Sequence, residues 1–111
     1  MATTTYKTLG QAAPAATTST DLYTVPASTS AIISTITIAN RAATDATFRI
    51  SQSLAGAALA NKDYLVYDAV IPGSGFITLT LGVTMATTDK LRVYASSANI
   101  SFNAFGTEVT A

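Results

Sequence analysis

The chain of 111 residues carries six basic and six acidic side chains, so its formal net charge is zero, and it contains neither histidine nor cysteine. Without these two residue types it cannot form a Ser-His-Asp or Cys-His nucleophile, a disulfide or a common zinc site. A positive mean hydropathy with 11% charged residues favours a folded domain that associates with copies of itself or with other proteins.

Apolar side chains at every second position predict β-strands, because successive side chains of a strand point to opposite faces. Turns rich in Gly, Pro, Asn, Asp and Ser separate these segments at strand-length intervals. In chain order the expected strands are residues 6–10, 21–25, 35–39, 46–50, 64–71, 77–81, 91–95 and 100–104. About eight short strands predict one all-β domain over residues 1–111, an antiparallel β-sandwich or jelly roll with a short N-terminal segment, residues 1–5.

The predicted core consists of the apolar residues that alternate with polar ones along these strands. It comprises Leu9, Val25, Ile32, Ile36, Ile38, Phe48, Ile50, Leu65, Tyr67, Ile77, Leu79, Leu81, Leu91, Val93, Ile100 and Phe102. Two stretches, residues 11–20 and 53–62, do not alternate. We interpret each as a loop, the second with at most one short helical turn, and a contact surface is the alternative for either.

Carboxylates are the remaining candidates for acid–base chemistry. Asp63 and Asp68 are the closest pair, five residues apart, but turn residues around Asp63 and the strand position of Asp68 indicate solvated or neighbour-paired side chains. Asp21, Asp45 and Asp89 lie at turns or strand edges, where aspartate accepts hydrogen bonds from backbone N–H groups. We therefore expect a protein that is not an enzyme, with no catalytic site, no metal site and no cofactor.

The aromatic residues Tyr6, Tyr23, Tyr64, Tyr94 and Phe105 could stack against sugars, but such residues more often flank the core or form oligomer contacts. The four interface candidates are Tyr6, Tyr23, Tyr94 and Phe105, and a sugar-binding face is the alternative. The six basic residues are scattered and balanced by acids, which argues against nucleic acid as a partner. The first residues lack the charged-then-apolar order of a signal peptide, and Ser and Thr interrupt the apolar stretch 31–39, so neither export nor a membrane span is expected.

Turn and strand segments over nearly the whole chain resemble a family of small virion proteins of tailed bacteriophages. They are Tyr6-Lys-Thr-Leu-Gly-Gln11, residues 13–18, Asp21-Leu-Tyr-Thr-Val-Pro-Ala27, residues 33–35, 40–42 and 81–83, Thr88-Asp-Lys-Leu-Arg-Val-Tyr-Ala95 and Ile100-Ser-Phe-Asn-Ala-Phe-Gly106. The resemblance implies a β-sandwich that is part of the particle. It does not fix whether the protein lies in the capsid or the tail, and it indicates no mechanism.

A small, neutral sandwich that tends to self-associate suits a particle component, and our first expectation is a capsid decoration (cement) protein that joins neighbouring major capsid protein subunits. The alternatives are a tail, baseplate or fibre-attachment component and, of another class, a carbohydrate-binding adhesin. We expect a homo-oligomer, with a trimer as first choice, in a virion assembled in the bacterial cytoplasm. Chain ends usually fray unless something holds them, so residues 1–5, residues 109–111 or both should lie against a neighbouring subunit.

Overall fold

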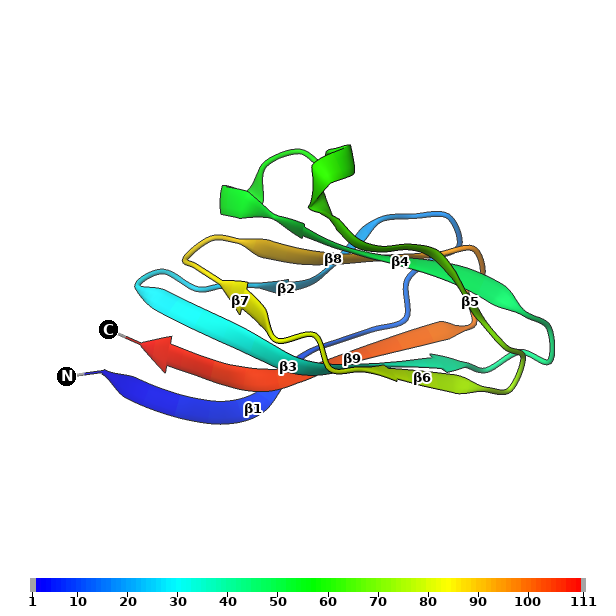
Figure 1. Ribbon diagram of the computed structural model, residues 1–111, viewed down its shortest axis with the longest axis horizontal. Coiled ribbons are helices and arrows are strands. Elements are labelled where there is room, and N and C mark those ends of the chain that lie inside the picture. The colour runs from blue at the N-terminus through cyan, green and yellow to red at the C-terminus, as the bar shows by residue number, and fades with distance from the viewer. Residues whose placement is uncertain (1, 111) are drawn as a thin grey trace.

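Two antiparallel β-sheets stacked face to face make up the protein (Figure 1). The computed structural model describes residues 2–110. In that range the strands are β1 (Thr3–Ala12), β2 (Thr20–Thr24), β3 (Thr29–Asn40), β4 (Ala46–Ser53), β5 (Tyr64–Ile71), β6 (Phe76–Leu79), β7 (Val83–Met85), β8 (Lys90–Ala95) and β9 (Ile100–Thr110). Two single-turn 3₁₀ helices, η1 (Leu54–Gly56) and η2 (Asn61–Asp63), join β4 to β5. The predicted all-β sandwich is confirmed.

The strand order is that of a jelly roll. Sheet A has the order β1-β9-β3-β6, with β7 also paired to β3, and sheet B has the order β2-β8-β4-β5. β6 and β7 pair with successive parts of β3 and are separated by residues 80–82, where Gly82 has φ of 64°, so they act as one interrupted strand. The first strand then pairs with the last, the second with the next to last, and so on inward to the β4–β5 pair. This nested pairing defines the double Greek-key arrangement.

The core lies between the two sheets and is made of side chains that point inward from both. Phe48 of β4 and Phe102 of β9 meet across it with ring centroids 6.2 Å apart in an edge-to-face arrangement. The predicted core residues found buried are Val25, Ile36, Ile38, Phe48, Ile50, Leu91, Val93, Ile100 and Phe102, while Leu9, Ile77 and Leu79 pack against them partly buried. Alternating apolar positions therefore identified nine of the 19 buried hydrophobic residues, and the large ones that they missed include Ile33, Ile71 and Met85.

Four predicted core residues are instead exposed, because β-bulges and a break in a strand shift the alternation. In β3 the register shifts at Ser34, so Ile33 points inward with Ile36, and Ile32 is 50% exposed. In β5 Asp68 has φ of 52° within an irregular pairing to β4, and Leu65 and Tyr67 lie on the outer side. Leu81 lies in the break between β6 and β7.

The connections and chain ends also differ from the sequence prediction. The segment after β4 has two 3₁₀ turns rather than at most one, and the short strand β7 was not predicted. Residues 3–5 are not a separate segment but the first part of β1, and Thr3 pairs with Thr110 of the same chain. The ends are therefore held by each other in this structure, while Met1 and Ala111 lie outside the described residues.

Candidate interaction surfaces

The outer side of sheet A is an uncovered sheet surface on which no strand residue is charged. Its members follow from the register, in which neighbouring strands place paired residues on the same side. We call this surface the sheet A face; it consists of Thr4, Tyr6, Thr8 and Gln11 of β1, Ser101, Asn103, Phe105, Thr107 and Val109 of β9, Ser30, Ile32, Thr35, Thr37 and Ala39 of β3, and Phe76, Thr78 and Thr84 of β6 and β7.

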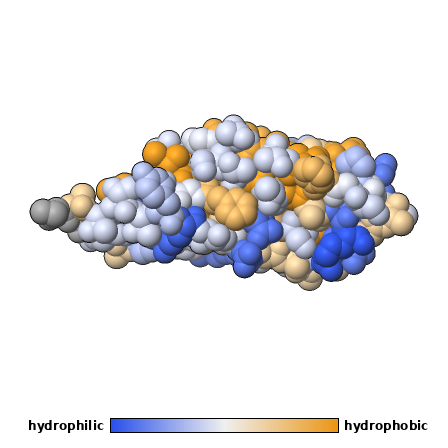
Figure 2. Space-filling view, turned by 90° about the horizontal axis from the view of Figure 1, so that it is seen from below, coloured by the Kyte–Doolittle hydropathy of each residue, from blue (hydrophilic) through white to orange (hydrophobic). Residues whose placement is uncertain are grey.

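None of these side chains is charged, and several large apolar ones are exposed. Tyr6 is 82% exposed and Phe76 is 76% exposed, and Ile32 and Phe105 are partly exposed between them. Figure 2 views the molecule from the sheet A side and shows mainly the pale colours of residues near the middle of the hydropathy scale, with orange areas and several deep blue, hydrophilic patches among them. Arg41 borders one end of the face, where its Nε donates to Ser101 Oγ at 3.0 Å.

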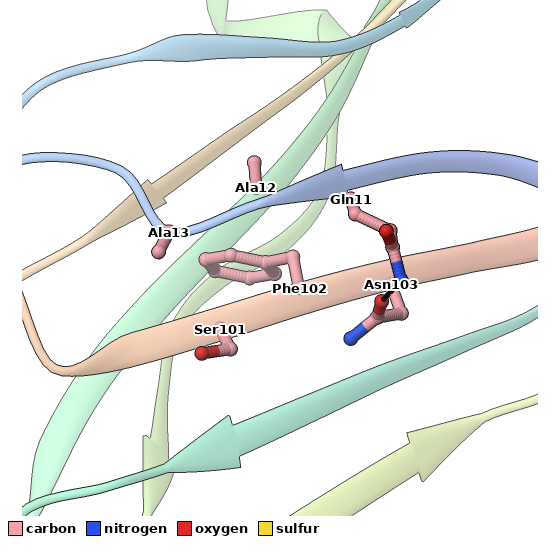
Figure 3. Close-up of a pocket in the computed structure, with 6 residues that line it drawn as sticks. All are labelled: Gln11, Ala12, Ala13, Ser101, Phe102 and Asn103. Atoms are coloured by element: carbon pink, nitrogen blue, oxygen red, sulfur yellow. Dashed lines mark hydrogen bonds between the residues drawn. The ribbon is translucent and has the colours of Figure 1, made fainter.

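Three hollows lie on this face, and the third is lined by Ser30, Ile32, Thr84, Thr107 and Val109. At one end, Gln11 Nε2 donates to Asn103 Oδ1 at 2.8 Å across β1 and β9, beside Ala12 and Phe102 (Figure 3). In the middle, Tyr6 and Phe105 line a second hollow. The first hollow carries amide, hydroxyl and apolar groups. The second carries hydroxyl and apolar groups together with Lys7, whose ammonium group is paired with Glu108.

The structure brings two of the four predicted interface residues together and separates the others. Tyr6 and Phe105 share the sheet A face, whereas Tyr94 lies on the outer side of sheet B. Tyr23 is 8% exposed and points between the sheets, because a register shift in β2 turns both Leu22 and Tyr23 inward. Tyr23 is therefore part of the interior and not a free contact residue in this chain.

Tyr23 belongs to a buried polar group that links the sheets. Its hydroxyl donates a short hydrogen bond to Glu108 of β9, and Lys7 Nζ of β1 lies 2.8 Å from the other carboxylate oxygen. Burial, followed by the hydrogen bond to Glu108, raises the pKa of Tyr23. Hydrogen bonds from Lys7 and then Tyr23 hold the pKa of Glu108 below its ordinary value. This group fixes one end of the sandwich through charge and hydrogen bonds.

The outer side of sheet B carries charged and aromatic side chains. The Arg49 guanidinium carbon lies 4.2 Å from the ring centroid of Tyr67 and 4.3 Å from that of Tyr94. Arg49 Nε and Nη2 also donate to the two oxygens of Asp68 at 2.6 and 3.2 Å, and this contact lowers the pKa of Asp68. Arg49 thus covers one face of both tyrosine rings, and its charge is matched by Asp68, so the cluster is satisfied within the chain.

The remaining carboxylates have structural partners. Asp63 accepts from the backbone N–H of Ala60 and does not share a site with Asp68. Asp45 and Asp89 accept backbone N–H bonds across turns, as expected. Asp21 does not; it pairs with Lys90 and Arg92 across β2 and β8, and the hydrogen bond from Lys90 is the main cause of its lowered pKa. Among the described residues no three His, Cys, Asp or Glu side chains gather as metal ligands would.

Comparisons with known proteins identify the fold of this chain but do not assign it to a family. No protein-family profile matches the chain, and no curated protein gives a significant match. Among solved structures, a chain in the structure of infectious bursal disease virus, Gx strain, superposes with a TM-score of 0.57 at 15% sequence identity. The match covers 98% of this chain and 32% of that one, so this chain spans about a third of its neighbour. At this identity the likeness shows a shared β-sandwich fold.

No helix in residues 2–110 is both long enough and apolar enough to cross a membrane.

Proposed function

We propose that this protein is a structural component of a virus particle, specifically a capsid decoration (cement) protein of a tailed bacteriophage that binds to the major capsid protein lattice. In this role it acts by binding and not by catalysis, as a homo-oligomer within the virion. A trimer suits the local three-fold positions of an icosahedral shell, where one small protein contacts several capsid subunits.

The observation that carries the proposal is a jelly roll with an uncharged, partly apolar outer sheet. Jelly rolls recur in viral capsid and lectin domains, and the solved structure that shares this fold comes from a virus. The sheet A face offers hydroxyl, amide and apolar groups over several strands, which suits a permanent contact that is insensitive to ionic strength. The resemblance of the strand and turn segments to phage virion proteins supports the same role.

A lectin function, the other common use of this fold, has less support on the outer side of sheet B. Sugars stack on open aromatic faces. There the guanidinium of Arg49 already lies over Tyr67 and Tyr94, and Tyr64 meets Tyr67 edge-to-face at 4.8 Å. These contacts argue against an open stacking platform.

The composition of purified particles tests the proposal. Quantitative mass spectrometry of intact particles, with this protein measured against the major capsid protein, should find the two in comparable copy number. A copy number far below that of the capsid protein would favour the alternative, a tail, baseplate or fibre-attachment component. Absence of the protein from purified particles would overturn the virion role itself.

A further inference from the structure

The charged side chains of the strands are divided unequally between the two outer faces. The outer side of sheet B carries Asp21, Arg49, Asp68, Lys90 and Arg92. The strand positions of the sheet A face carry none. We propose that the sheet A face is the surface through which this chain binds a second copy of itself. This inference rests on the homo-oligomer of the proposed function and names the surface that forms it, and it is tested on the purified protein alone.

The absence of charge selects a second copy as the occupant. Where two identical faces meet, each charged residue approaches an identical face, and close to a symmetry axis it approaches its own copy. Like charges placed together across an interface cost several kcal/mol. The strand positions of the sheet A face carry no charge to repel a copy. Two cations lie close to it: Arg41 at one end, bonded to Ser101, and Lys7 beside the central hollow, paired with Glu108. The whole chain has a formal net charge of zero, so copies approach without long-range repulsion.

The size of the face matches a stable contact between proteins. β3 has 12 residues and β9 has 11, which gives a length of roughly 36–40 Å at about 3.3 Å per residue. Four strand positions at about 4.8 Å spacing give a width of roughly 19 Å. The product is about 700 Å², close to the roughly 800 Å² that each partner contributes to an interface of standard size.

The large apolar residues are spread over all four strand positions of the face, although Tyr6 and Phe105 share one hollow and Ile32 lines another. Tyr6 lies on the edge strand β1, Phe76 on the opposite edge strand β6, and Ile32 and Phe105 on the strands between them. The first six residues of β1 are also exposed, so a copy seated here would cover this edge as well. Such a broad, flat surface fits a second sheet better than a small molecule.

Thr37 is the position at which to test this contact. It lies on the central strand β3 and pairs with Thr78 on one side and with Asn103 on the other, so a substitution there reaches the middle of the face. Aspartate is the best replacement, because its short side chain cannot carry its charge out to the rim as lysine can. Thr47 is the matched control, since it is a half-buried threonine on the central strand β4 and faces outward from sheet B.

The experiment measures the mass of the purified full chain by sedimentation velocity from about 1 μM to about 1 mM. The unmodified protein and Thr47→Asp should form the same defined oligomer, whereas Thr37→Asp should bind its copy at least about 100-fold more weakly, as expected for an unpaired charge buried in an interface. A dimer weakened by Thr37→Asp would indicate two sheet A faces in contact about a two-fold axis. A trimer weakened by Thr37→Asp would indicate that the face meets a different surface of its neighbour in a ring. Either result supports the inference, whereas an oligomer that Thr37→Asp leaves intact would overturn it.

A second pair of variants keeps the test valid even if Thr37→Asp fails to fold. Tyr6→Ser changes a side chain that is 82% exposed, and Val70→Ser is the control on the outer side of sheet B, where the side chain is 58% exposed. Tyr6→Ser should weaken association by about 10-fold or more, and Val70→Ser should not. A monomer at every concentration, or equal weakening by both members of a pair, would overturn the inference. A monomer that loses particle binding through Thr37→Asp would also overturn it and would assign the face to another virion protein.

Discussion

Truncation of Phe102 to alanine tests whether the two sheets are held together as the structure indicates. Phe102 is 1% exposed and meets Phe48 across the sandwich at 6.2 Å. Removal of a buried phenylalanine ring typically costs about 3–5 kcal/mol. A domain of 111 residues has a free energy of unfolding of about 6–17 kcal/mol at ~0.05–0.15 kcal/mol per residue. Phe102→Ala should therefore remove a large fraction of the stability.

The change in melting temperature follows from the same numbers. At ~2.1 cal/mol/K per residue the unfolding entropy is about 230 cal/mol/K, so a loss of 3–5 kcal/mol should lower Tm by about 13–21 °C. Urea unfolding followed by far-ultraviolet circular dichroism gives the free energy directly. The double variant with Phe48→Ala should show a coupling of about 0.5–1.5 kcal/mol between the rings.

Phe76→Ala is the control, because that ring is 76% exposed and its loss should change monomer stability by no more than about 0.5 kcal/mol. A loss below about 1 kcal/mol for Phe102→Ala, or equal losses for Phe102→Ala and Phe76→Ala, would refute the packing of the two sheets described here.

Three further predictions concern polar and backbone positions. The pKa of Glu108 is held below its ordinary 4.5, so its stabilising contribution is complete above pH 4.5 and is lost as the pH falls through the lower native pKa. The native protein and Glu108→Gln should therefore converge in stability in acid, as measured by urea unfolding at several pH values. Gly106→Ala should lower stability by about 1–3 kcal/mol in the same assay, because a Cβ there would lie 2.0 Å from the carbonyl oxygen of Ile32. Asp63→Asn combined with Asp68→Asn should leave incorporation into particles unchanged, as measured by particle composition.

Each of these predictions has a contrary outcome. A stability difference between the native protein and Glu108→Gln that stays constant from pH 7 to pH 3 would show that the carboxylate charge contributes nothing. A neutral Gly106→Ala would mean that β9 and β3 are farther apart at this point. Loss of infectivity by the doubly substituted protein, with normal folding and normal incorporation, would reopen an enzymatic or metal-binding role.

The interior could be predicted wherever strand alternation is regular. Ile36 and Ile38 were placed inside because nothing interrupts the pattern around them. Ile32 was misplaced because the extra residue Ser34 moves the preceding part of β3 by one position, and a bulge of this kind has no simple signal in composition. Tyr23 was predicted to be an interface residue but is buried, since a register shift in β2 turns two consecutive residues inward.

The surfaces were harder to predict, because they depend on which strands share a sheet. The sequence shows threonines alternating with apolar residues, but it does not show that Thr37, Thr78 and Asn103 lie side by side. The hydrogen bond between Tyr23 and Glu108 joins residues 85 positions apart, and it could not be inferred from local pattern. The nested pairing of strands places the uncharged residues side by side on the sheet A face and the charged residues on the outer side of sheet B.

The central claim is that this protein decorates a phage capsid, and addition of the purified protein to particles that lack it tests the claim most directly. Particles stripped of the protein, or assembled without it, would be separated into heads and tails and titrated with labelled protein. The proposed function predicts saturable binding to heads in a fixed ratio to the major capsid protein, together with greater resistance of the heads to heat. Binding to isolated tails alone, or no saturable binding to either part, would contradict it.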